Sequence, residues 1–223
     1  KTIVKEWLYQ LLRDDHHIVR SPKSYNSQIG VPLSVWEMQS SNDLAIFEAG
    51  ISEPGEMQRL GAIIQPDVGI FTNIGSAHDE NFESLDQKAT EKLRLFATCK
   101  NLIYCRDHFV IHDQLNKASF LTDDIRVFTW SRRQKADLQI GRITASNGET
   151  EIQGIYENRF IHIRIPFTDD ASVENAIHCW ALLLFLDIPN EQIAKRIELL
   201  SPVAMRLEMK EGINNCSVIN DSY

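Results

Sequence analysis

The chain has 223 residues, 43% of them hydrophobic, and its formal net charge at pH 7 is -8. This length and composition predict one large globular domain with a substantial core, or one domain with a small appendage. The acidic balance argues against binding to nucleic acid or to an anionic membrane, both of which need a basic face. An acidic protein can still bind a nucleotide where lysines, helix ends and divalent cations neutralise the phosphates.

The four cysteines show no C-x-x-C spacing, and three of them stand within apolar runs. We therefore expect reduced core thiols in a cytoplasmic protein. The longest apolar run, residues 179–186, is far too short to cross a bilayer, and no signal peptide is visible. Because the chain begins inside an amphipathic pattern and stops just after a strand-like run, we expect it to be an excised piece of something longer.

The N-terminal region predicts a helix, a strand and a second helix. Residues 1–13 carry apolar side chains on one helical face, and Ile18 and Val19 form a short strand. A polar loop follows over residues 21–28. After residues 29–32 a second helix is expected to run to about Met38.

Residues 42–82 predict a strand, a helix and a strand. The strands cover residues 44–47 and 68–72, and apolar residues recur at helical spacing between them. Strands joined in this way are expected to pair in parallel through a right-handed crossover. Glu48 and His78 would then lie at the same carboxyl edge of one sheet, where open α/β sheets bind ligands. Taken singly, each is more simply a solvated or structural residue, but together they predict a metal and phosphate site.

The next predicted helix, residues 84–99, places lysines at informative positions. At about 100° per residue one apolar stripe runs along it, formed by Leu85, Ala89, Phe96 and Cys99. Lys92 falls in the middle of this stripe, Lys88 lies at its edge, and Arg94 lies on the opposite, solvated side. A lysine on a buried face must reach solvent, pair with an acid or be chemically altered, and the first of these is the simplest.

The second half of the chain predicts further α/β elements and one antiparallel unit. Strands are expected at residues 102–105, 126–130, 207–209 and 217–219, and helices at 109–115, 173–186 and 190–200. Residues 137–167 alternate apolar and polar positions between turn signals, which predicts an antiparallel meander attached to the sheet as a side element. His108 and His112 stand four apart and form a weak candidate metal pair, because no third ligand is nearby.

The residues also carry a recognisable set of motifs spread over nearly the whole chain. They are Tyr25–Pro32 (YNSQIGVP), Glu48-Ala49-Gly50 with Gly55-Glu56, Asn73–His78 (NIGSAH), Lys92-Leu93-Arg94, Met205–Glu208 (MRLE) and Asp221-Ser222-Tyr223. In this order they resemble the central ATP-binding domain of the Mur ligases. The Ala-His and Asp-Ser-Tyr forms are most similar to the family's D-alanyl-D-alanine-adding members. The resemblance implies a P-loop-type α/β fold, with a mostly parallel sheet flanked by helices and a small antiparallel meander.

The resemblance assigns phosphate, metal and catalytic roles to five residues. Lys1 and Thr2 match the end of the phosphate loop G-x-x-G-K-[ST], so Lys1 would bridge the terminal phosphates of ATP and the Thr2 hydroxyl would hold Mg²⁺. The glycines that would precede Lys1 are not in this chain. Glu48 matches a ligand of the first Mg²⁺ ion and His78 a ligand of the second. Lys92 matches a lysine that the family carries as a carbamate, an anionic oxygen ligand for a divalent ion.

Further nucleotide contacts are implied by the same comparison. Asn175 matches the residue that contacts adenine, and Arg206 and Asp221 match residues around the phosphates and the ribose. Asn26 lies in a loop near the phosphates. Ala171-Ser172 stand where the family often has His-Asn, which weakens the expected nucleotide contacts on that side.

The implied activity is ATP-dependent amide formation through an acyl phosphate, with D-alanyl-D-alanine added to a UDP-N-acetylmuramoyl tripeptide in peptidoglycan precursor synthesis. Residues 1–223 would be the central domain, with the C-terminal domain starting at about residues 221–223. Both substrates would be bound mainly by flanking domains, so this fragment is expected to have little ligase activity and weak nucleotide affinity. Two alternatives stay open: a diaminopimelate-adding or folylpolyglutamate-forming relative, and a non-catalytic nucleotide-binding module.

Overall fold

The computed structural model describes residues 1–121, 124–203, 208–211 and 216–220. The helices are α1 (Thr2–Leu12), α2 (Gly30–Trp36), α3 (Glu56–Ile64), α4 (Leu85–Leu93), α5 (Phe109–Lys117), α6 (Asp170–Phe185) and α7 (Asn190–Ile197), with 3-10 turns η1 (Asp79–Asn81) and η2 (Arg94–Phe96). The strands are β1 (Ile18–Arg20), β2 (Leu44–Ile46), β3 (Val68–Phe71), β4 (Asn101–Cys105), β5 (Arg126–Ser131), β6 (Leu138–Ser146), β7 (Glu149–Tyr156), β8 (Arg159–Ile165), β9 (Glu208–Glu211) and β10 (Ser217–Asn220). The predicted α/β class is confirmed.

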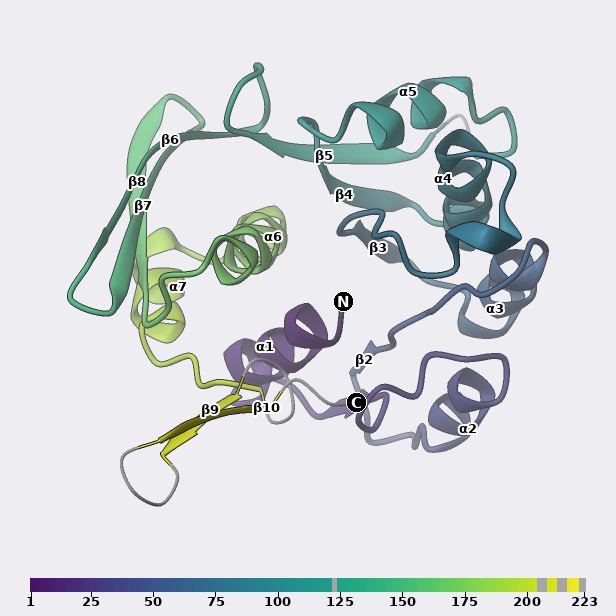
Figure 1. Cartoon of the computed structure of the whole chain (residues 1–223), viewed down its shortest axis with the longest axis horizontal. Helices are drawn as coiled ribbons and strands as arrows, with labels where there is room; N and C mark the ends of the chain where they lie inside the picture. Colours follow the sequence, from purple (N-terminus) through teal and green to yellow (C-terminus); the bar gives the residue numbers. More distant parts are fainter. Residues whose placement is uncertain (122–123, 204–207, 212–215, 221–223) are drawn as a thin grey trace.

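The largest sheet has six strands in the order β3-β4-β5-β6-β7-β8. Its first part is parallel, with β4 paired to β3 and to β5. Helix α6 lies on one side of this part, and α4 and α5 lie on the other (Figure 1). Because helices cover both faces, β4 is apolar along most of its length and buried from Leu102 to Cys105.

The antiparallel meander is confirmed, and it is joined directly to the parallel strands. Strand β6 pairs in parallel with β5 at Trp130–Leu138 and Ser131–Gln139, and so continues the same sheet. Strands β6, β7 and β8 then pair antiparallel. Both hairpin turns have two central residues with positive φ, 52° and 82° at Asn147-Gly148 and 48° and 61° at Glu157-Asn158. Positive φ at both positions is the geometry of tight type I′ hairpins.

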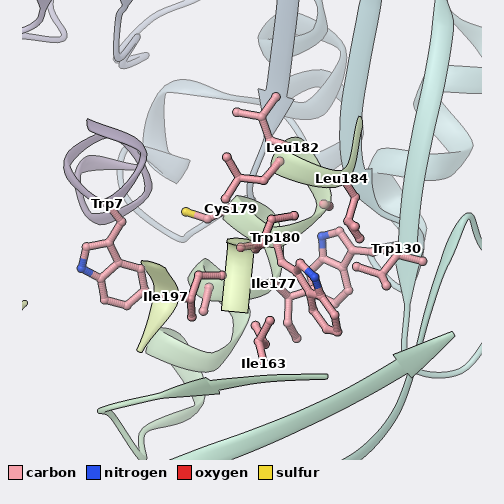
Figure 2. Close-up of a cluster of buried hydrophobic side chains, with 14 of the residues drawn as sticks. Trp7, Trp130, Ile163, Ile177, Cys179, Trp180, Leu182, Leu184 and Ile197 are labelled. Atoms are coloured by element: carbon pink, nitrogen blue, oxygen red, sulfur yellow. The ribbon is translucent and has the colours of Figure 1, made fainter. Parts of the chain in front are cut away.

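The main core surrounds α6. Figure 2 shows Trp7 of α1, Trp130 of β5 and Ile163 of β8 packed around the α6 side chains, among them Ile177 and Trp180. The buried indole of Trp180 donates to Asn190 Oδ1 at 2.9 Å, which ties α6 to the first residue of α7. Helix α6 therefore holds together elements from both ends of the described chain.

Helix α6 begins three residues earlier than the apolar pattern predicts. Asp169 is its N-cap, and its Oδ1 accepts a hydrogen bond from Ser172 N at 2.8 Å. Asn175 consequently lies in the second turn of the helix rather than at its start. Three other helices end earlier than expected: α2 at Trp36 instead of about Met38, α7 at Ile197 instead of residue 200, and α4 at Leu93 instead of residue 99.

The direct pairing expected between β2 and β3 is wrong. In the described ladders β2 pairs in parallel with β1, starting at Ile18–Leu44, and β3 pairs in parallel with β4, starting at Val68–Asn101. A cleft of about 230 Å³ lies between β2 and β3 and is also lined by α1. A strand-helix-strand pattern predicts parallel direction, but it does not require the two strands to be neighbours.

Three of the four cysteines, Cys99, Cys105 and Cys179, are buried, Cys216 is exposed, and all four are free thiols. This agrees with the expectation of reduced thiols in the core. In the described parts of the chain, no helix combines the length and the apolar character needed to span a membrane.

Candidate active site

Polar residues from distant parts of the sequence meet in the cleft between β2 and β3. Most of its lining is apolar, but Lys1, Glu48, Asn73 and Lys92 also line it. Lys1 is the N-cap of α1, Glu48 and Asn73 follow the ends of β2 and β3, and Lys92 comes from the last turn of α4. Strand carboxyl ends together with a helix N-terminus are where α/β proteins bind anionic ligands.

Glu48 is the buried acid of this site, with 5% of its surface exposed. Its Oε1 accepts a hydrogen bond from Asn26 Nδ2 at 2.7 Å, and its backbone N–H donates to Ser21 Oγ at 3.2 Å. Its Oε2 is buried and has no hydrogen-bond partner in the described part of the chain. A buried carboxylate oxygen without a donor is costly, so this oxygen fits a hard divalent cation.

Asn26 is held against Glu48 by Gly50. The Gly50 N–H donates to the Asn26 carbonyl at 2.7 Å. A Cβ at position 50 would lie 2.9 Å from both Cγ and Oδ1 of the Asn26 side chain. The two motifs YNSQIGVP and EAG are therefore parts of one arrangement, because only glycine lets the asparagine approach so closely.

Lys1 lies next to Glu48. Its Nζ donates to the Ala49 carbonyl at 3.0 Å, which brings the ammonium group to the end of β2. Thr2 is the first residue of α1 and is half-buried. Lys5, one turn further along α1, is buried and donates to the Ser21 carbonyl at 2.5 Å, so it supports the loop beneath Glu48. The sequence analysis did not identify Lys5.

Lys92 is half-buried, and its Nζ donates to the Asn73 carbonyl at 3.2 Å. Burial, followed by the charges of Lys1 and Lys88, lowers the pKa of this amine from 10.5 to about 7, although the charge of Asp79 acts in the opposite direction. About half of the amine is then neutral at pH 7, and the neutral form is the one that reacts with carbon dioxide.

The predicted position of Lys92 at the centre of a buried helical stripe is wrong. The fully buried lysine is Lys88, with 1% exposed, whereas Leu85 is 50% exposed. Helix α4 ends at Leu93 and continues as a 3-10 turn, so a regular 100° rotation does not hold to Cys99. Arg94, expected on the solvated side, is half-buried and forms an ion pair with Glu91 at 3.2 Å.

His78 is not among the described residues that line the cleft. It lies on the exposed loop after β3, at the N-cap of η1. Nowhere in the described residues do three His, Cys, Asp or Glu side chains gather closely enough to hold a metal ion. Of the four predicted catalytic residues, the structure thus brings together Lys1, Glu48 and Lys92 in the cleft lining.

The residue predicted to contact adenine is in α6 and is not among the described residues that line the cleft. Asn175 is half-buried in α6, next to Glu174, whose Oε1 lies 3.0 Å from Nε2 of His108. The hydrogen bond with His108 lowers the pKa of Glu174. Arg206 and Asp221 lie outside the residues that the structure describes.

The two histidines four apart do not form a metal pair. The His108 ring contacts Glu174, whereas Nδ1 of His112 is 2.6 Å from the Tyr104 hydroxyl. Each imidazole has its own partner from a different element, so this candidate is wrong.

Comparison with known proteins gives consistent results. A family model described as "Mur ligase middle domain" matches residues 1–183. The chain is 28% identical over 228 residues to a UDP-N-acetylmuramoyl-tripeptide–D-alanyl-D-alanine ligase of Bacillus subtilis, covering 100% of this chain and 47% of that protein. A protein of the same name from Borreliella burgdorferi is 27% identical, with the same coverage.

Solved structures show the same fold. A crystal structure of MurF from Acinetobacter baumannii has a TM-score of 0.86 at 22% identity, covering 100% of this chain and 48% of that one. The MurF ligase of Thermotoga maritima, solved in complex with ADP, has a TM-score of 0.82 at 19% identity, covering 100% and 51%. This chain spans about half the length of these relatives, and it belongs to the Mur ligase family as its middle domain.

Proposed function

We propose that this chain is the ATP-binding domain of a ligase that joins D-alanyl-D-alanine to a UDP-N-acetylmuramoyl tripeptide. The names of the most similar curated relatives support this substrate pair. Both substrates would be bound mainly by parts of the enzyme outside this domain. The four free thiols agree with a cytoplasmic location, where ATP is available.

The observation that carries the proposal is the buried, unpartnered Oε2 of Glu48 beside Lys1 and Lys92. A structural carboxylate in a fold without chemistry would have both oxygens hydrogen-bonded or exposed. Two lysines beside a buried acid suit a site where an anionic triphosphate and a carboxylate meet. The alternative is a nucleotide-binding module that is not an enzyme. Such a module would not need a buried acid beside two lysines.

The reaction has two steps. The terminal carboxylate of the tripeptide attacks the γ-phosphorus of ATP, which gives an acyl phosphate and releases ADP. The amine of D-alanyl-D-alanine then attacks the acyl carbon, so that an amide forms, phosphate leaves and the amine loses a proton. Lys1 would reduce the repulsion between the two anions in the first step through its charge at the terminal phosphates.

The residues that would hold two Mg²⁺ ions are Glu48 and the Thr2 hydroxyl for one, and His78 and Lys92 for the other. Bound Mg²⁺ would supply positive charge to the phosphate oxygens. Lys92 would serve as a carbamate, formed when its neutral amine adds to carbon dioxide and loses a proton. The pKa of about 7 supports this modification. Asn175 would contact adenine, Arg206 and Asp221 the phosphates and ribose, and Asn26 would orient Glu48.

The experiment uses the full-length protein with ATP, the UDP-linked tripeptide and one amine at a time. We expect ADP release that depends on D-alanyl-D-alanine and does not occur with diaminopimelate or glutamate. Diaminopimelate- or glutamate-dependent release would favour the alternative ligases, and no amine-dependent release at all would contradict the proposal.

Two variants in the same assay test the site. Glu48→Gln is expected to lower kcat at least 100-fold and to raise the Mg²⁺ concentration needed for half-maximal rate, because it removes the charge that a metal needs. Lys92→Ala is expected to lose a similar factor and to recover in part with added short carboxylates. Glu37→Gln, on the exposed end of α2, is the matched control. A fully active Glu48→Gln enzyme would remove this residue from the site.

A further inference from the structure

Lys88 makes three hydrogen bonds to one short loop. Its Nζ donates to the carbonyls of Gly75 at 2.8 Å and Ala77 at 2.5 Å, and to Oδ1 of Asp79 at 2.6 Å. An ammonium group has three donors, so all of them are used. The side chain itself is buried within the fold, with 1% exposed. A buried charge of this kind is stable only where such partners surround it.

The residue between these acceptors is His78. Its backbone is left-handed, with φ 61° and ψ 25°. A residue with a Cβ pays roughly 1–2 kcal/mol for this conformation and keeps it only where neighbouring contacts enforce it. Lys88 holds the carbonyl immediately before His78 and the carboxylate immediately after it.

The other contacts of this loop are mainly local. Asp79 N–H donates to the Ser76 carbonyl at 3.2 Å, and Asn81 N–H donates to the His78 carbonyl at 3.2 Å. The Asn81 side chain reaches the Ser52 carbonyl at 2.9 Å, which joins two exposed loops. Lys88, by contrast, connects the loop to the buried face of α4.

Helix α4 is a firm base for this contact. Ser84 caps its N-terminus by accepting a hydrogen bond from Gln87 N at 3.1 Å, and Ala89 and Leu93 are fully buried. Lys92 stands one turn beyond Lys88 on the same helix and contacts Asn73, at the start of the same loop. One helix therefore contacts both ends of the loop that carries His78.

We propose that Lys88 is a positioning residue that holds His78 in its left-handed conformation at the edge of the active site. The part of this inference that concerns the ligand of His78 rests on the proposed function. The part that concerns how Lys88 holds the loop does not. Lys88 itself touches no substrate. Its role is to keep the backbone of His78 in the left-handed region when no ligand is bound to the loop.

The first test measures loop order in the full-length protein without nucleotide. Lys88→Met keeps an unbranched side chain, one atom shorter, and removes the three donors together with the positive charge. We expect amide hydrogen exchange in residues 76–82 to become about tenfold faster, because local opening no longer breaks these bonds. Lys100→Met is the matched control, because Lys100 also pairs with an aspartate, Asp67 at 2.8 Å, but on the exposed surface. Unchanged exchange in Lys88→Met would overturn the inference.

The second test asks whether Lys88 acts through His78. We expect Lys88→Met and His78→Ala each to raise the Mg²⁺ concentration for half-maximal rate, and the double variant to match His78→Ala alone. A purely structural lysine would instead add its own loss in the double variant, and that result would overturn the inference. If Lys88→Met does not fold, Asp79→Asn, which removes the ion pair but keeps an acceptor, carries the same comparison with a smaller effect.

The two tests separate this inference from the proposed function. A wild-type protein without ligase turnover would contradict the proposed function, while the exchange measurement would still decide whether Lys88 holds the loop. Conversely, an active enzyme in which Lys88→Met leaves both exchange and Mg²⁺ dependence unchanged would overturn only the role of Lys88.

Discussion

His178 is a fully buried histidine in the third turn of α6. Its Nδ1 accepts a hydrogen bond from Trp130 Nε1 at 3.1 Å, and the two rings meet edge to face with centroids 5.1 Å apart. Burial lowers the pKa of His178 to about 3. The folded protein therefore keeps this ring neutral at pH values where an unfolded chain would protonate it.

This difference predicts an acid-sensitive contribution to stability. Between pH 6.5 and 3 the unfolded state binds one proton at His178 that the folded state does not bind, so the free energy of unfolding falls by about 1.4 kcal/mol for each pH unit lost. His178→Gln, which keeps an acceptor for Trp130, is expected to reduce this slope in urea titrations at several pH values. His162→Gln, at an exposed position of β8, is the control. Equal slopes in wild type and His178→Gln would contradict the prediction.

At the residue scale, chemistry was more predictable than burial. Glu48 could be singled out because a lone acid follows an apolar strand, and the structure places it in the cleft lining. The sequence could not predict that Lys88 is more buried than Lys92. Helical periodicity assumes a regular helix and contains no information about the loop that packs against α4. The roles of the site residues stay predictions.

Strand β3 and the turn η2 meet at a single glycine. A Cβ on Gly69 would lie 2.4 Å from Cδ1 of Phe96, whose ring is buried against Phe71 and Leu102. No side chain fits at this point unless the ring moves. The close approach explains why glycine stands inside a strand, where it is otherwise unfavourable.

Gly69→Ala is therefore expected to lower the free energy of unfolding by about 1–3 kcal/mol through overpacking. Adding Phe96→Leu is expected to recover part of the loss, because it removes the clashing ring edge. Gly141→Ala in β6 is the control, since its new Cβ would make only an ordinary contact, 3.6 Å from the Gln153 carbonyl. Chemical denaturation of the three variants checks this, and a neutral Gly69→Ala would show that Phe96 adapts without cost.

At the element scale, local patterns were reliable and pairings were not. Alternation and the Asn147-Gly148 turn identified the meander, because side-chain period and turn chemistry are local properties. The start of α6 was predicted three residues too late, although Asp169 is an N-cap residue. The first turn of the helix is mostly polar, so the apolar pattern begins only after it. The separation of β2 from β3 by a cleft that α1 also lines involves segments far apart in the sequence, and no local pattern contains this information.

Two sets of parallel strands, β1-β2 and β3-β4-β5, lie on opposite sides of the cleft. Lys1 and Glu48 belong to the side built from α1 and β2, and Asn73 and Lys92 belong to the side built from β3 and α4. Figure 1 shows the N-terminus between these two sides. A ligand that contacts Lys1, Glu48 and Lys92 at once would link the two sides, so nucleotide binding and the stability of the cleft are expected to be coupled.

Mg-ATP is therefore expected to slow amide hydrogen exchange in β2 and β3 of the full-length protein, and to leave β7 and β8 unchanged because they lie at the far edge of the sheet. At a nucleotide concentration about 100 times Kd, the stabilisation reaches about 2.7 kcal/mol. Glu48→Gln is expected to lose the protection of β2, since the link on that side depends on its carboxylate. Uniform protection of all strands would contradict this prediction, because it would mean that the nucleotide stabilises the described strands as one cooperative unit.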